Sequence, residues 1–171
     1  MNTSYSKGRG NRKALPAVLF AGLVAGSLDA LGASIVYGPL LGKSTVANIF
    51  RGIASAVFGK RAFQEGSEMV AWGLFFHYCI ALSFAVFYFL IYPHLPWLRA
   101  RKWLSGLLYG IFVWCVMNLA VLPLVFKRGI SLQPWPALKG MLILIVAIGL
   151  PIALLAHAWY TSRNRPVLRK E

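Results

Sequence analysis

The chain has 171 residues, of which 58% are hydrophobic and 13% charged, and its formal net charge is +14. This is the composition of a membrane protein, because a soluble domain has about 25% charged residues. The excess of Lys and Arg does not indicate nucleic-acid binding, since these residues are spread over every loop and both tails and do not form one basic face. We therefore expect no nucleic-acid partner.

Four apolar stretches are each long enough to cross a bilayer, which takes about 20 residues of helix. They comprise residues 14–37, 69–92, 103–126 and 139–160. Backbone polar groups in lipid must be paired internally, and these stretches lack the alternating pattern of barrel strands. The sequence therefore predicts an all-α fold: an integral membrane four-helix bundle that forms one transmembrane domain over residues 1–171.

The first loop contains a segment, 44–58, with apolar residues at helical spacing. These residues are Val46, Ile49, Phe50, Ile53, Val57 and Phe58. The segment is too short to span, so we predict an amphipathic helix that lies on the membrane or packs against the bundle. A lid over an opening between spans is the functional alternative.

An even number of spans places both termini on one side of the membrane. Most of the 18 Lys and Arg residues fall in the two tails and the second loop: Lys7, Arg9, Arg12, Lys13, Arg99, Arg101, Lys102, Arg163, Arg165, Arg169 and Lys170. The positive-inside rule therefore predicts cytoplasmic termini, with membrane lipids as partners through anionic head groups at the cytoplasmic face. Interfacial aromatic residues agree: Tyr37, Trp72 and Trp135 outside, and Tyr92, Trp97, Trp103, Trp159 and Tyr160 inside.

Asp29 is the only acidic residue within a predicted span. An ionised side chain at mid-membrane costs about 2.5–3.5 kcal/mol, so such a residue marks a candidate site. Gly22 and Gly26 lie on the same helix face and form a GxxxG pair suited to close packing. We therefore expect Asp29 to point into the bundle.

Asp29, His77 and Asn118 each lie about eight residues from the outer end of their spans, a depth of roughly 12 Å. Trp114, mid-way along the third span, is one helical turn from Asn118, and its indole N–H needs a partner. The spacing predicts an intramembrane polar layer. Two interpretations stay open: a structural layer that fixes helix register, or a proton- or ion-responsive site.

Other polar or helix-breaking residues give no catalytic motif. His77 and His157 differ in depth by roughly 15 Å, so one haem iron cannot join them. No HExxH, CxxCH or phosphate-binding glycine loop occurs. We expect no metal, no cofactor and no catalytic residue. Pro151 is expected to kink the fourth span or free a backbone carbonyl, and Pro123 to end the third.

Several segments carry a resemblance: 52–55 through 63–66, then Gly73, His77-Tyr78, Ile80-Ala81 and Tyr88, then Gly106, Tyr109-Gly110, Met117-Asn118 and 121–124, with a weaker match at 149–153. They resemble the YagU-like group of small four-span bacterial inner-membrane proteins. The resemblance implies a four-helix bundle in the bacterial inner (plasma) membrane and supplies no substrate, reaction or cofactor. His77 and Asn118 fall within the matching segments, and Asp29 lies outside them.

The sequence thus favours a non-enzymatic integral membrane protein: a small accessory or stress-related protein, or a subunit of a larger membrane complex. The alternative is a small transporter or channel for protons, ions or solutes that uses the Asp29–His77–Asn118 layer. Because one bundle of this size leaves little room for a solute path, transport would require a homo-oligomer.

Overall fold

The computed structural model describes residues 14–36, 45–64, 66–127 and 133–163. Four of its helices are long and apolar enough to cross a membrane: Ala14–Ile35, Glu68–His94, Lys102–Phe126 and Pro134–Ser162. The part of the chain that is described contains no strand. The predicted all-α four-helix membrane bundle is confirmed, although the fourth helix begins at Pro134 and not at Lys139. Tyr37 and the tails at 1–13 and 164–171 lie outside the described residues.

The spans are built from shorter elements. The first is α1 (Ala14–Ile35), and the second is α4 (Glu68–Ile91), which continues into η2 (Tyr92–His94). The third comprises α6 (Lys102–Cys115), η3 (Val116–Val121) and α7 (Leu122–Phe126), and the fourth comprises α8 (Pro134–Leu144), η4 (Ile145–Gly149) and α9 (Leu150–Arg163). Three short helices connect spans: α2 (Val46–Phe58), α3 (Arg61–Gln64) and α5 (Pro96–Ala100).

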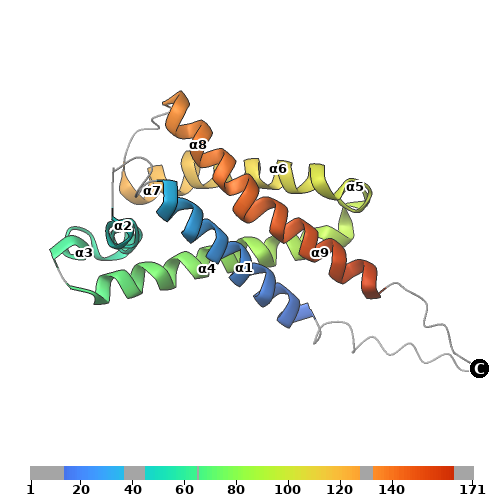
Figure 1. Cartoon of the computed structure of the whole chain (residues 1–171), viewed down its shortest axis with the longest axis horizontal. Helices are drawn as coiled ribbons and strands as arrows, with labels where there is room; N and C mark the ends of the chain where they lie inside the picture. The colour runs from blue at the N-terminus through green and yellow to red at the C-terminus, as the bar shows by residue number, and fades with distance from the viewer. Residues whose placement is uncertain (1–13, 37–44, 65, 128–132, 164–171) are drawn as a thin grey trace, which may run out of the picture.

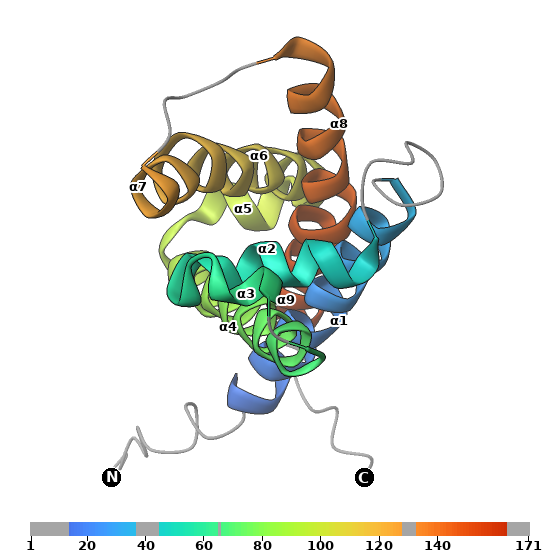
Figure 2. The same ribbon diagram turned by 90° about the vertical axis from the view of Figure 1, so that its left-hand side faces the viewer.

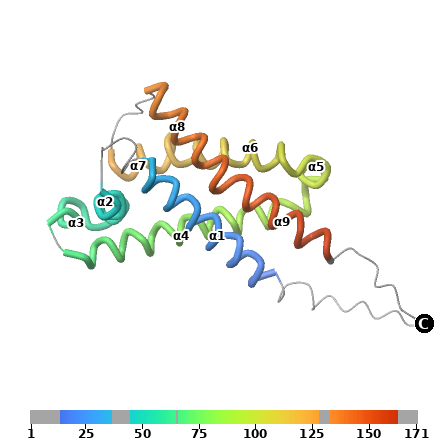
Figure 3. Tube along the Cα trace, in the orientation of Figure 1, coloured from blue at the N-terminus to red at the C-terminus, as the bar shows by residue number. Residues whose placement is uncertain are grey.

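The four spans form two crossed layers (Figure 1). One layer holds α4 and the α6–α7 helix, which are joined through α5. The other holds α1 and the α8–α9 helix, which run side by side and pack on the first layer, α1 against α4 and α9 against α6 (Figures 1 and 2). Helix α2 lies across one end of the bundle, here called the α2 end. Helix α5, the start of α1 and the end of α9 lie at the other, the α5 end (Figure 3).

Both prolines predicted to disturb the spans follow π-helical segments. Segment η3 precedes Pro123, and η4 precedes Pro151. Proline lacks an N–H and crowds the preceding turn, and a wider π-turn accommodates this within a continuous helix. The expectation that Pro123 ends the third span is therefore wrong, because α7 continues to Phe126.

The main hydrophobic core lies in the α5 half and draws on all four spans. Tyrosine hydroxyls link these helices through hydrogen bonds: Tyr88 with Ser105 (3.0 Å), Tyr92 with His157 Nδ1 (2.9 Å), Tyr109 to the Phe84 carbonyl (2.6 Å) and Tyr160 to the Phe89 carbonyl (2.9 Å). Tyr92, predicted to lie at the depth of the membrane interface, is buried within the protein (1% exposed), and its ring stacks on Tyr160. The exposed Trp97 and Trp103 do lie at the α5 end.

Helix α2 is the predicted amphipathic helix, and it packs against α4. Thr45 caps its start by accepting a hydrogen bond from the Asn48 N–H (3.2 Å), and Gly59 ends it with a positive φ of 62°. Phe50 and Ala54 are buried against α4. Gly73 of α4 permits this contact, since a Cβ there would overlap the Phe50 carbonyl.

Candidate binding site in the α2 half

The α1–α4 contact positions the first two residues of the predicted layer. A Cβ added to Gly26 would lie 2.9 Å from the Tyr78 ring, so only glycine allows this approach. Across the same contact, His77 Nε2 makes a hydrogen bond to the Gly26 carbonyl (2.8 Å), and the Ser27 and Tyr78 hydroxyls are 2.9 Å apart. His77 is therefore held by α1 backbone, one turn from Asp29.

Asp29 is half-buried and has few partners. Its carboxyl group is close enough to His77 for an electrostatic interaction. Yet it accepts no hydrogen bond from any residue that the structure describes. An ionisable side chain within a membrane span is ordinarily paired, since leaving it unpaired costs free energy. Asp29 is thus available to an external partner.

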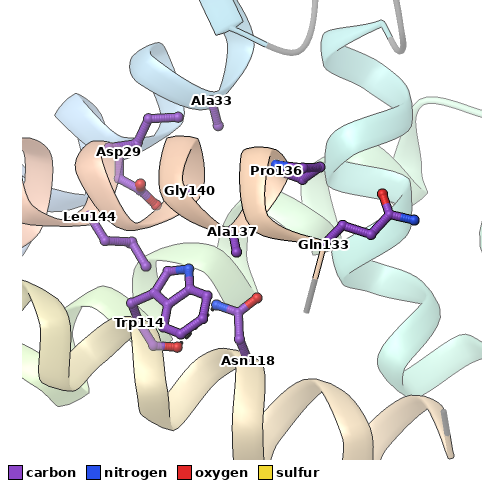
Figure 4. Close-up of a pocket in the computed structure, with 10 residues that line it drawn as sticks. Asp29, Ala33, Trp114, Asn118, Gln133, Pro136, Ala137, Gly140 and Leu144 are labelled. Atoms are coloured by element: carbon purple, nitrogen blue, oxygen red, sulfur yellow. Dashed lines mark hydrogen bonds between the residues drawn. The ribbon is translucent and has the colours of Figure 1, made fainter. Parts of the chain in front are cut away.

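The first cavity that Asp29 lines, here called the polar cavity, has a volume of about 450 Å³. It lies between α1, the third span and the start of α8, and its lining includes Asp29, Trp114, Asn118, Gln133 and Gly140. Figure 4 shows the Asp29 carboxyl group directed toward the side from which Trp114 and Asn118 approach. This volume is within the range of about 300–1,000 Å³ for small-molecule sites.

Trp114 and Asn118 contribute hydrogen-bonding groups to this cavity. Asn118 Nδ2 donates to the Trp114 carbonyl (3.0 Å), and the Asn118 amide oxygen accepts no hydrogen bond from a described residue (Figure 4). The Trp114 indole N–H makes no hydrogen bond to a described residue. Asn118 sits in the π-helical segment η3, an irregularity often found at functional sites.

The second cavity, here called the apolar cavity, has a volume of about 530 Å³. It lies between α4 and the third span, with α2 along one side. Its lining is mostly aliphatic and aromatic, and includes Ile53, Phe84, Met117, Val121 and Val125. His77 lies on this cavity and not on the polar one. Asp29 and Leu144 line both, so the two cavities adjoin at Asp29.

The predicted layer is therefore divided in the structure. Asp29, Trp114 and Asn118 share the polar cavity, while His77 faces the apolar cavity and meets Asp29 from the other side. No hydrogen bond among the described residues joins Asn118 to Asp29 or His77. Sequence reasoning missed Gln133, because it precedes the predicted fourth span. It also missed the contact between the Ser27 and Tyr78 hydroxyls, because a single hydroxyl in a span does not indicate its partner on another helix.

Within the described ranges, no group of three or more His, Cys, Asp or Glu residues is placed to hold a metal ion. No family model matches the chain, and no curated protein or solved structure matches it either. The arrangement around Asp29 is therefore interpreted from its geometry.

Proposed function

We propose that this membrane protein binds an amphiphilic molecule with a cationic head group in the α2 half of the bundle, without catalysing a reaction. One observation carries the proposal: Asp29, a carboxylate with no hydrogen-bond partner among the described residues, lines a polar and an apolar cavity at once. A ligand that occupies both must combine a polar head with an apolar body.

The polar cavity suits a cationic head. Asp29 supplies negative charge, the Asn118 and Gln133 amides supply oxygen acceptors, and Trp114 supplies an aromatic ring. Carboxylates and indole rings both attract ammonium groups. No Lys or Arg lines either cavity, so His77 is the one residue of their lining that can carry positive charge beside Asp29.

The apolar cavity suits a hydrocarbon tail. Its lining residues come from α2, α4 and the third span, and one of them, Gly52, faces open space. A tail there gains little affinity, because lipid is as apolar as the cavity. The cavity therefore contributes to selectivity and little to affinity, because it accepts the apolar tails of molecules that already reside in the bilayer.

The packing of the α5 half supports a role as an accessory protein or as a subunit of a larger complex. It argues against a self-contained channel. Tyr88, Val113 and Ile152 are fully buried there, and tyrosine hydrogen bonds link the helices. The close packing of these described residues therefore disfavours a path for a molecule from Asp29 through that half of the bundle. The transporter alternative requires a homo-oligomer or a rearrangement of the tyrosines.

The lining chemistry supports a non-enzymatic role without a cofactor. Ser55 is the one hydroxyl on the apolar cavity, and it donates to the Gly52 carbonyl (2.7 Å). His77 Nε2 is engaged by the Gly26 carbonyl. The two are therefore not arranged as a nucleophile and its base, a pairing that needs a direct hydrogen bond.

Ligand binding is tested with the protein in nanodiscs, using dodecyltrimethylammonium, tetramethylammonium and dodecyl sulfate as probes. We expect both cations, and not the sulfate, to change the fluorescence of Trp114, because Trp114 lines the polar cavity together with Asp29. An equal response of Trp114 to all three probes contradicts the proposal. Asp29→Asn should weaken cation binding about tenfold or more.

The apolar cavity is tested by filling it. Gly52→Phe should exclude the dodecyl cation and leave the binding of tetramethylammonium unchanged. Gly66→Phe is the matched control, because Gly66 faces open space away from both cavities.

For orientation, we propose a bacterial inner-membrane protein of the YagU-like type with both termini in the cytoplasm. In a chain without Cys79 and Cys115, single cysteines at Ser4 or Thr161 should resist membrane-impermeant thiol reagents in intact cells, and one at Ser131 should react. The opposite labelling pattern would reverse the orientation.

A further inference from the structure

A third cavity, of about 440 Å³, lies at the α5 end, far from Asp29 along the bundle. It is formed by the turn between α5 and α6 together with α9, and its lining includes Arg99, Arg101, Lys102, Trp103 and His157. The acidic side chains that the structure describes, Asp29 and Glu68, both belong to the α2 half. No described carboxylate therefore neutralises the three basic residues of this cavity.

Two of its side chains are held in place by the protein. Arg99 Nη2 donates to the Pro93 carbonyl (2.6 Å), which orients the guanidinium, and its other N–H groups donate to no described residue. His157 Nδ1 pairs with the Tyr92 hydroxyl (2.9 Å). When Tyr92 donates in this bond, the imidazole proton lies on Nε2, which becomes a donor on the side of the ring away from Tyr92.

We propose that this cavity binds the phosphate group of an anionic membrane lipid. The site is independent of the proposed function at Asp29. Arg and Lys side chains converging on one cavity are suited to phosphate oxygens. Trp103 and Leu104 add apolar surface on the same cavity, and Trp103 is 60% exposed. A lipid can contact both the basic residues, through its phosphate, and the apolar side chains, through its hydrocarbon chain. Free phosphate can contact only the basic residues.

The test compares two variants with the same change in net charge. One carries Arg99→Gln, Arg101→Gln and Lys102→Gln. The control carries Lys60→Gln, Lys127→Gln and Lys139→Gln, which removes three exposed lysines outside the α5 end. Each protein is released from nanodiscs of phosphatidylcholine mixed with phosphatidylglycerol, and the retained lipids are counted by native mass spectrometry. Thermal unfolding of both variants verifies that they are folded.

We expect wild type and the control to retain phosphatidylglycerol in preference to phosphatidylcholine, and the α5-end variant to lose about tenfold or more of this preference. Equal loss in both variants would show diffuse attraction to the membrane and overturn the site. A further arm adds inorganic phosphate: displacement of the lipid at millimolar concentration would assign the cavity to free phosphate and also overturn the proposal. Failure at Asp29 leaves these outcomes unaffected, because the two sites share no residue.

Discussion

The two halves of the bundle differ in how completely their polar side chains are paired. In the α5 half, the hydroxyls of Tyr88, Tyr92, Tyr109 and Tyr160 are hydrogen-bonded across helices. In the α2 half, the Asp29 carboxyl and the Trp114 indole N–H have no hydrogen-bond partner among the described residues, and two cavities lie beside a small core of Ala54, Ala62 and Met69. Paired polar groups hold a membrane bundle together, whereas an unpaired ionisable group within a span is a candidate functional site.

Glycine placement explains much of this difference. A Cβ on Gly106 would lie 3.0 Å from the Leu150 Cα, and one on Gly149 would overlap the Gly106 carbonyl. The third and fourth spans therefore pack backbone to backbone near the middle of the bundle. Toward the α2 end, α4 and the third span separate and α2 lies between them (Figures 1 and 2), which leaves room for the apolar cavity.

The largest expected effect comes from the close contact between the third and fourth spans. Gly149→Ala should lower the free energy of unfolding by about 3 kcal/mol, because the added methyl meets the backbone of Gly106 and Gly110, which cannot move aside cheaply. Denaturant titration in mixed micelles measures this value. An unchanged unfolding curve would show that the spans are not in backbone contact here.

The second prediction compares two glycines at the α2 end. Gly73→Ala should destabilise by about 1–3 kcal/mol, because it pushes α2 off α4 at Phe50. Gly52→Ala, on α2 itself, meets open space and should stabilise by up to about 1 kcal/mol through helix propensity. Hydrogen exchange of the α2 amides is the measurement. Similar exchange rates in both variants would contradict the observed docking of α2.

The sequence predicted the helical features well, because each depends on a local pattern. Runs of apolar residues predicted the spans, and the period of Phe50 and Ile53 predicted α2. The Gly22–Gly26 pair predicted close packing for α1, which the structure shows against Leu82 and Tyr78 of α4. These signals need no knowledge of which helices are neighbours.

The site was less accessible to such reasoning. Equal depth was inferred for Asp29, His77 and Asn118, but depth does not specify the direction around each helix, and His77 proves to face a different cavity from Asn118. The tyrosine hydrogen bonds were missed because tyrosine near a span end is typical of the interface. Only the tertiary packing shows that Tyr92 meets His157.

A smaller effect is expected from a paired group in the α5 half. Tyr92→Phe keeps the stacking on Tyr160 and removes the hydroxyl that bonds His157. The loss should be about 1 kcal/mol, the net contribution of one hydrogen bond. The double variant with His157→Leu measures the coupling, and additive losses from the two single changes would show that the bond contributes nothing.

The smallest effect on stability is expected at the residue that matters most for the proposed function. Asp29→Asn keeps the shape of the side chain and removes its charge, and no hydrogen bond to a described residue is broken. An amide costs less to bury than a carboxylate, so the free energy of unfolding should stay within about 0.5 kcal/mol of wild type or rise. Binding of tetramethylammonium should nevertheless fall. A variant that unfolds as readily as Gly149→Ala would instead make Asp29 a structural residue, and the difference between the two halves would then not reflect binding.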